Sequence, residues 1–348
     1  RTTVRYLYYE NYAVMSEVRI IQVGSDDADL RLDRWFGRYF PDVTHGALQK
    51  LLRKGQIRVD GKRAKSNHRL SIGQSIRVPP LDSVSSPKKP HWKEQRINKK
   101  DNLLEELLKS SILYKDDEVL AIYKPPGIPV QGGTGTTKHI DGALDALKFE
   151  SDQRPRLVHR LDKDTSGVLL LGRTRQAARW LTQAFREQSA NKTYWGIVVG
   201  ELRPVTGRID LPISKLPGKY GEKMMIDKSE GQRAVTDYGI IEKLGNKASW
   251  VALRPRTGRT HQLRVHMMAL GTPILGDGKY GGEGAFLESE GLSRKLHLHA
   301  RDICLPRPNG VQLFVEAALP EHMLRAWDLL GFELKAYKDP FIDLPSKT

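Results

Sequence analysis

A polar, basic stretch near the first quarter of the chain constrains most strongly how the protein can fold. Residues 82–100, DSVSSPKKPHWKEQRINKK, are rich in Ser, Pro and Lys and show no apolar periodicity. Such a composition is typical of a linker, and its positive charge keeps it extended. Because 348 residues are also many for one ordinary domain, we expect a small domain at 18–81 and a larger one at 101–334. An N-terminal extension, 1–17, and a C-terminal tail, 335–348, flank them.

The small domain is expected to contain two short helices followed by a small curled sheet. Apolar residues that recur on one helical face predict helices over residues 29–40 and 44–54. Gly55 follows the second helix and can adopt the left-handed conformation that ends it. Short strands are predicted at 56–59 and 75–78.

The charge balance favours a polyanionic partner. Lys and Arg number 57 against 41 Asp and Glu, a formal net charge of +16. This surplus favours nucleic acid or an anionic membrane as partner, and nucleic acid more than an excess of charge that serves only solubility. Seven basic residues of the small domain would be neighbours and could neutralise phosphates without reading bases; the alternative is a solvated helix face. They are Lys50, Arg53, Lys54, Arg58, Lys62, Arg63 and Lys65.

Cysteine usage and hydropathy set the expected compartment. The single cysteine, Cys304, cannot form an internal disulfide, so a reducing compartment is the default. No run approaches the roughly eighteen apolar residues of a membrane helix. Arg1–Val14 lacks the apolar core of a signal peptide and precedes Met15, which can serve as an initiator. We therefore expect a cytoplasmic protein without a membrane partner.

The larger domain alternates strand-like and helical patterns. Apolar runs predict strands at 119–123, 168–171, 194–199, 250–253 and 311–316. Long helices are expected at 174–188 and 261–270. These patterns indicate a mixed domain of strands and helices.

A polar loop next to a buried strand is the first candidate for catalysis. Leu157–Gly172, LVHRLDKDTSGVLLLG, places Asp162 and Asp164 just before the apolar run 168–171. A carboxylate at such a position can lie in a cleft that controls its ionisation. The alternative is a turn in which Asp and Ser side chains bind nearby amides, and composition alone favours neither.

A basic segment, Leu253–Leu270, is the second candidate. Arg264 beside a carboxylate would keep that acid charged and orient it. The same segment, with Arg259, could instead bind phosphates, and the two roles can coexist. His261 and His266 are five residues apart, which does not align two ligands on one helix face, so no metal site is expected.

Four motifs, in order, resemble the RluA family of pseudouridine synthases. His159–Gly167, HRLDKDTSG, is similar to the family signature H-R-L-D-x-x-T-S-G, and Lys124–Gly127, KPPG, to its K-P-x-G turn. Lys192–Tyr194 resembles the second motif. Thr257–His266, TGRTHQLRVH, followed by Gly271–Tyr280, GTPILGDGKY, resembles the third.

The small domain resembles the S4 RNA-binding domain along RLDRWFGRYF…ALQKLLRKGQIRVDGKRAKSNHRLSIGQSIRV. The order of parts is similar to the RluC-like branch, which modifies large-subunit ribosomal RNA. The resemblance covers about Val18 to Trp327. It implies an α+β fold, with a small S4 domain beside a catalytic domain that has a mixed, mostly antiparallel sheet and flanking helices.

The resemblance also implies a chemistry and its residues. The family isomerises uridine to pseudouridine in RNA without a cofactor, and its catalytic aspartate corresponds to Asp162. Arg264 would form a charge-assisted pair with Asp162, and Tyr194 would pack against the target base. Arg160 would fill the space that the extruded uridine leaves. The carboxylate attacks C1′ or removes the 2′ proton, and the sequence does not choose between these routes.

The expected partner is ribosomal RNA of the large subunit, with transfer RNA open, and no DNA. A monomer would suffice because all the proposed groups lie in one chain. Two other functions compete: an RNA-binding protein without catalysis, and a nucleoside hydrolase. Binding does not require Asp162, and a hydrolase would need a second acid opposite it, for which the sequence offers no motif.

Overall fold

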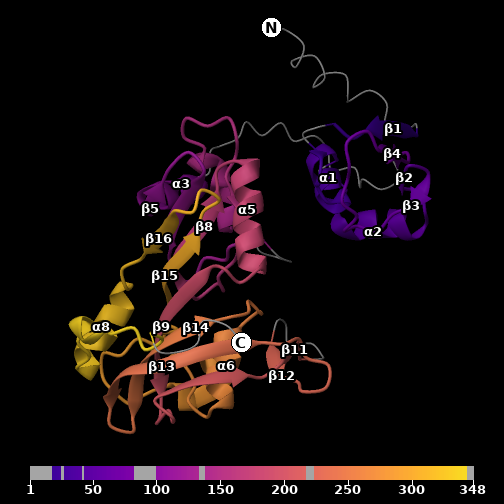
Figure 1. Ribbon diagram of the computed structural model, residues 1–348. Helices are drawn as coiled ribbons and strands as arrows, with labels where there is room; N and C mark the ends of the chain where they lie inside the picture. Colours follow the sequence, from indigo (N-terminus) through magenta and orange to yellow (C-terminus); the bar gives the residue numbers. More distant parts are fainter. Residues whose placement is uncertain are drawn as a thin grey trace. The chain divides into compact units, whose positions relative to one another are not determined.

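The computed structural model describes residues 18–24, 27–40, 43–81, 99–132, 138–216 and 223–342. The chain divides into two compact units, Arg1–Glu94 and Gln95–Thr348 (Figure 1). Nearly all of the predicted linker, the predicted extension and the end of the tail lie outside the described residues. The domain boundaries given for the sequence therefore stay predictions.

The first unit contains two helices and a four-stranded antiparallel sheet. Its elements are β1 (Arg19–Gln22), α1 (Leu32–Tyr39), α2 (His45–Arg53), β2 (Arg58–Val59), β3 (Lys62–Arg63) and β4 (Ser75–Val78), and the strand order is β1-β4-β2-β3. The hydroxyl of Thr44 caps α2 by accepting a hydrogen bond from the Ala47 amide at 3.3 Å. Helix α1 begins three residues later than predicted, because Asp29 has a positive φ of 64° that a helix excludes.

The core of this unit comes from the buried faces of α1 and α2. Leu32, Trp35 and Phe36 of α1 meet Leu48 and Leu52 of α2, all with exposed fractions of 6% or less. This spacing of three and four residues places the apolar side chains on one face of each helix. The basic residues between them are thereby left toward solvent.

The second unit is built on a ten-stranded sheet. The strand order is β10-β13-β14-β9-β15-β8-β6-β5, with β16 beside β15 and β7 beside β8. Only β15 and β8 pair in parallel; the other pairs are antiparallel. The expected α+β class, with a mixed and mostly antiparallel sheet, is confirmed.

The strands and helices of this unit have the following bounds. The strands are β5 (Ile112–Lys115), β6 (Val119–Lys124), β7 (Arg156–Leu157), β8 (Ser166–Gly172), β9 (Asn191–Val199), β10 (Thr206–Asp210), β11 (Ile213–Lys215), β12 (Met224–Ile226), β13 (Val235–Leu244), β14 (Ala248–Pro255), β15 (Leu298–Pro306) and β16 (Gln312–Glu316). The helices are α3 (Lys99–Ser110), α4 (Ile140–Ala143), α5 (Arg175–Arg186), α6 (Gln262–Ala269), α7 (Gly278–Gly281) and α8 (Glu321–Leu330), with short 3₁₀ turns at Leu144–Leu147, Gly282–Ala285 and Leu334–Ala336.

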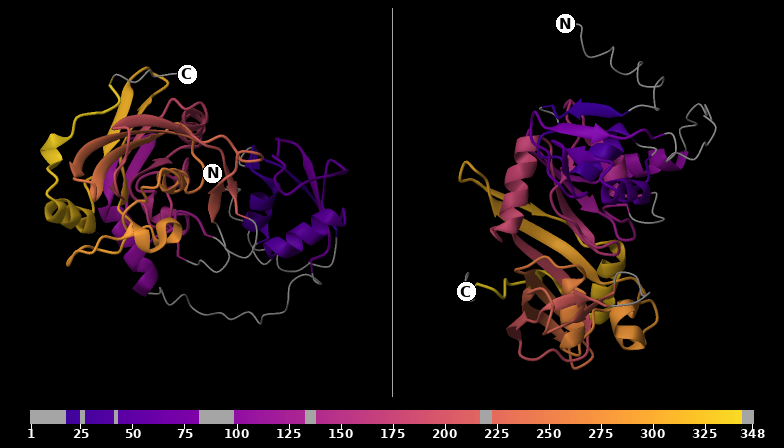
Figure 2. Two further views of the ribbon diagram at one scale, coloured as in Figure 1. Left: turned by 90° about the horizontal axis from the view of Figure 1, so that it is seen from below. Right: turned by 90° about the vertical axis from the view of Figure 1, so that its right-hand side faces the viewer.

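Helices cover both faces of the sheet. All seven residues of β8 are buried: Val168 and Leu170 pack with Leu181 of α5, whereas Leu169 and Leu171 pack with the α3–α4 side. Strands β9 and β14 are likewise covered by α8 and α6. Figures 1 and 2 show α5 and α8 beside different parts of the sheet. A strand covered on both faces must be apolar throughout, which explains the continuous apolar run of β8.

Candidate active site

The loop that carries Asp162 ends at a close contact between two parallel strands. Gly167 pairs with Ala300 of β15, and a Cβ on Gly167 would lie 2.1 Å from the Ala300 carbonyl oxygen. Its φ of +115° also excludes other residues. Next to it, the Ser166 hydroxyl lies 2.8 Å from Nδ1 of the buried His299. The TSG sequence therefore fixes the end of the loop that carries Asp162, called the catalytic loop below for its predicted role.

Lys124 holds the other side of this loop. Its side chain is fully buried, and the ammonium donates hydrogen bonds to the carbonyl oxygens of Pro125 at 2.9 Å, Lys163 at 2.9 Å and Thr165 at 2.7 Å. Burial lowers the pKa of Lys124, whereas the charges of Asp164 and Asp162 act in the opposite direction. The lysine of the KPPG turn thus ties that turn to the catalytic loop, a role that the sequence did not show.

Asp162 is surrounded by cations but keeps its oxygens free. Burial raises the pKa of its carboxyl group, while Arg264, Arg160 and Lys124 lower it. No hydrogen bond or ion pair joins the Asp162 carboxylate to any residue that the structure describes. Burial outweighs these charges, so the pKa of Asp162 lies above its usual value; the cations limit that rise without bonding to the carboxylate oxygens.

Arg264 has a different partner from the one expected. We expected a charge-assisted pair with Asp162; instead the guanidinium binds Asp277 twice, at 2.6 Å and 2.8 Å. The side chains of Arg264 and Asp277 are 8% and 1% exposed. The reason is that Asp277, which caps α7, is buried and requires a counterion. Arg264 still acts on Asp162 through space.

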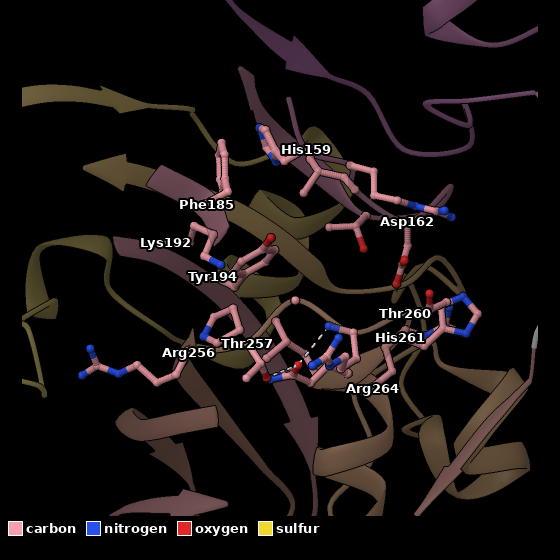
Figure 3. A pocket seen from close by; sticks show the side chains of 18 of the residues that line it. His159, Asp162, Phe185, Lys192, Tyr194, Arg256, Thr257, Thr260, His261 and Arg264 are labelled. Carbon is pink, nitrogen blue, oxygen red and sulfur yellow. Dashed lines mark hydrogen bonds between the residues drawn. The ribbon is translucent and has the colours of Figure 1, made fainter. Parts of the chain in front are cut away.

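Two cavities meet at Asp162. The first, of about 520 Å³, is lined by Tyr194 and Lys192 of β9, Phe185 of α5 and the segment 255–264 (Figure 3). The second, of about 1020 Å³, has a basic rim. The basic residues of that rim are Arg160, Lys163, Lys215, Arg264, Lys279, Arg294 and Lys295.

The structure brings the predicted catalytic residues together. Asp162, Arg160, Tyr194, Arg264 and Arg259 all line the first cavity. Burial and the charge of Asp162 raise the pKa of the Tyr194 hydroxyl, so it stays neutral. The Nε of Arg259 donates to the Arg233 carbonyl at 3.1 Å, which leaves part of its guanidinium for a ligand.

The seven predicted RNA-binding residues of the first unit are exposed. Arg58 differs from the others because it donates to the carbonyl oxygens of Gly55 at 3.2 Å and Gly61 at 3.1 Å. It therefore fixes the turn between β2 and β3. The exposure of all seven is compatible with phosphate binding, which stays a prediction.

His159 of the signature is a structural residue in this geometry. Its Nε2 accepts a hydrogen bond from the Leu170 amide at 2.8 Å, and its ring stacks on Phe185 at 4.5 Å. Burial, assisted by the charge of Lys192, lowers its pKa to about 3. A neutral imidazole can accept this bond, and the residue thus anchors the loop to β8 and α5.

Sequence reasoning missed Asp277 and Tyr280. The Tyr280 hydroxyl lies 2.7 Å from Nδ1 of His261, and the guanidinium carbon of Arg264 lies 5.0 Å from the Tyr280 ring. Asp277 and Tyr280 belong to the GDGKY part of the third motif, and that match was the one sign in the sequence that they contribute to the site. They form the wall that supports Arg264.

The described residues contain no group of three or more His, Cys, Asp or Glu that could hold a metal ion. Among the helices of the described ranges, none is both long and apolar enough to cross a membrane.

Comparisons with known proteins agree with this geometry. Residues 118–269 match the family described as RNA pseudouridylate synthase. Ribosomal large subunit pseudouridine synthase C of Rickettsia conorii is 35% identical over 85% of this chain and 95% of its own length. RNA pseudouridine synthase 4, mitochondrial, of Arabidopsis thaliana is 31% identical over 91% of this chain and 83% of its own. The solved structure of human RNA Pseudouridylate Synthase Domain Containing 4 matches with a TM-score of 0.58 and 31% identity, covering 68% of this chain and 98% of that one.

Proposed function

Because the chain belongs to the RNA pseudouridylate synthase family and so converts uridine to pseudouridine in RNA, we propose that Asp162 is its catalytic carboxylate. The observation that carries this proposal is the position of Asp162. It lies where the first cavity, lined by Tyr194 and Phe185, meets a wider cavity with a basic rim. A uridine bound across this junction would present its sugar to the carboxylate.

The reaction breaks the N1–C1′ bond, turns the uracil and joins C5 to C1′. The first cavity, with Tyr194, offers an aromatic wall for an extruded base. The basic rim of the second offers counter-charges for the phosphates on either side. Asp162 can then attack C1′ or remove the 2′ proton, since its oxygens have no other partner among the described residues. Arg160, exposed and next to Asp162, would enter the space that the base vacates.

We further propose that large-subunit ribosomal RNA is the substrate. The name of the Rickettsia conorii relative specifies the large ribosomal subunit. The exposed basic residues of the first unit would add phosphate contacts. All the proposed catalytic groups belong to one chain, so we expect the protein to act as a monomer, and to act in the cytoplasm.

Tritium release from RNA labelled at uracil C5 tests the reaction and the residue together. Forming the C5–C1′ bond expels the C5 hydrogen into water. We expect release from unmodified large-subunit ribosomal RNA by the native protein and none by Asp162→Asn. Asp152→Asn, an exposed change elsewhere in the same unit, is the matched control and should retain release.

The alternatives give different results. Release only from a transfer RNA pool would contradict the ribosomal substrate. Free uracil in the products would indicate a hydrolase. Release that persists in Asp162→Asn would contradict the assignment of that carboxylate.

A further inference from the structure

Lys192 is a cation that lines the first cavity and that the proposed chemistry does not yet use. It lies two residues before Tyr194 on β9, and the pleat of a strand directs residues i and i+2 to the same face. Both side chains line the first cavity, and Figure 3 shows them next to each other on one wall. Thr193, between them, is buried and points to the opposite face. Lys192 is therefore directed at the same occupant as Tyr194.

The ammonium of Lys192 has no counterion. No described residue forms a hydrogen bond or an ion pair with it, and the ring centre of Phe185 lies 6.0 Å from Nζ. Burial lowers the pKa of Lys192 to about 8, and no carboxylate charge acts to raise it. A half-buried charge without a partner is costly unless the occupant of the cavity supplies one.

The other charged and titratable groups of this cavity do not neutralise Lys192. From the catalytic loop these are His159, Arg160 and Asp162; from α5, Arg186; from β9, Tyr194; and from the segment 255–264, Arg256, Arg259, His261 and Arg264. Asp162 is the only acid among the lining residues that the structure describes. It lies where the first cavity joins the second. The cavity thus carries an excess of positive charge and favours an occupant that becomes negative.

The reaction produces such an occupant. When the N1–C1′ bond breaks, its electron pair stays with the base and spreads over the N1, O2 and O4 atoms of uracil. C1′ meanwhile bonds to the Asp162 carboxylate, or C2′ loses its proton to that carboxylate, which leaves a C1′=C2′ double bond until the proton returns to C2′ as C5 bonds to C1′. The negative base must then turn before C5 bonds to C1′ and the C5 proton leaves to solvent.

On the premise of the proposed function, we propose that Lys192 donates a hydrogen bond to a carbonyl oxygen of the detached uracil and stabilises its negative charge. Lys192 keeps its proton throughout, so the step needs no further reactant. A fixed donor aimed at a charge that develops only during the reaction accelerates the chemical step more than it strengthens binding. The same contact would keep the free base in the cavity while it turns.

Single-turnover tritium release at saturating RNA tests this role. Lys192→Met removes the charge at similar length and should slow release about 100-fold, the loss typical for one such donor. The dissociation constant for RNA should change by less than about threefold, because the charge develops after binding. Lys192→Arg keeps a cationic donor and should recover part of the rate. Lys247→Met, in the exposed turn between β13 and β14, is the matched control and should match the native protein.

A pH profile gives a second readout that a purely structural role would not change. The native rate should fall as the pH rises past about 8, where the Lys192 ammonium loses its proton. In Lys192→Arg this fall should shift to higher pH, because arginine stays charged. Thermal unfolding should show Lys192→Met no less stable than the native protein, since the change removes a half-buried charge that lacks a partner.

Three results would overturn the inference. One is release from Lys192→Met at the native rate. Another is weaker RNA binding with a smaller salt dependence and an unchanged rate, which would assign Lys192 to a phosphate. The third is a pH profile of Lys192→Arg that coincides with the native one. No release by the native protein would overturn the proposed function and this inference with it, so the two failures are distinct.

Discussion

Replacing Asp277 by Asn tests whether a buried ion pair holds Arg264 beside the catalytic loop. Both side chains are nearly enclosed, at 8% and 1% exposure, and they share two contacts of 2.6 Å and 2.8 Å. Asp277→Asn removes the negative charge and leaves the guanidinium buried without a counterion. Breaking a buried pair in this way costs about 3–5 kcal/mol. Since Asn retains one carbonyl acceptor, we expect the lower end, about 3 kcal/mol.

Thermal unfolding followed by tryptophan fluorescence measures this loss in the second unit. For a unit of this size, 1 kcal/mol corresponds to about 2–4 °C, so the midpoint should fall by about 6–12 °C. Asp339→Asn is the matched control: its carboxylate is 36% exposed and lies 3.2 Å from Arg254. A pair of that exposure contributes about 0–1 kcal/mol, so the control should unfold within a few degrees of the native protein.

A double variant separates the pair from its surroundings. Asp277→Asn combined with Arg264→Met removes both charges and leaves neither group buried alone. Its loss of stability should be smaller than the sum of the two single losses by at least about 2 kcal/mol. Additive losses, or a midpoint for Asp277→Asn within about 2 °C of the native value, would refute the reasoning.

Further predictions concern the loop, the strand junction and acid stability. Lys124→Met removes the ammonium donor from three carbonyl oxygens, of which only that of Lys163 keeps another donor, the Gly127 amide at 2.9 Å. The change should cost about 2 kcal/mol or more, with loss of tritium release. Gly167→Ala forces a Cβ to 2.1 Å from the Ala300 oxygen and should lower the free energy of unfolding by more than about 3 kcal/mol. The control Gly245→Ala, whose Cβ meets nothing within 4 Å, should lower it by about 1 kcal/mol. Chemical denaturation measures both losses. Burial lowers the pKa of His297 to about 4 from 6.5. The unfolded chain therefore binds the proton first, and stability falls as pH falls from 6.5 to 4; His297→Leu should flatten this loss in melts between pH 7 and 4.5.

Elements with an uninterrupted apolar pattern could be predicted from the sequence. The runs at 119–123 and 168–171 are β6 and β8, because a strand covered on both faces has no position for a polar side chain. Helix α5 follows Thr174, whose hydroxyl accepts a hydrogen bond from the Ala177 amide at 3.0 Å. The information needed for these elements is local.

Strand β15 was missed because its polar residues find partners only in the folded chain. Its centre, His299 to Asp302, has no alternating or continuous apolar pattern. In the structure His299 lies 2.8 Å from the Ser166 hydroxyl, and Arg301 binds Glu316 at 2.9 Å. Strand β15 nevertheless lies between β9 and β8, and so carries the contact that fixes the catalytic loop.

The residues of the candidate site also divide into those that a local motif predicts and those whose role depends on contacts in the folded chain. Asp162, Tyr194 and Arg264 were found through motifs, and the structure places all three around one cavity. Asp277 lies thirteen residues after Arg264, and their pairing depends on how α7 packs against α6. A buried arginine with one partner and an exposed arginine with none look identical in a sequence, so the partner could not be chosen.

The corrected partner of Arg264 explains how a partly buried carboxylate can be both charged and reactive. Burial alone would favour the protonated acid, which can neither attack C1′ nor accept the 2′ proton. A direct ion pair would restore the charge but would occupy an oxygen that the reaction requires. The structure avoids this conflict because Arg264 is bonded to Asp277, and Lys124 to three carbonyl oxygens, while both still lower the pKa of Asp162. Cations with other partners thus limit the rise in the pKa of Asp162 that burial causes, and leave its oxygens free for the sugar.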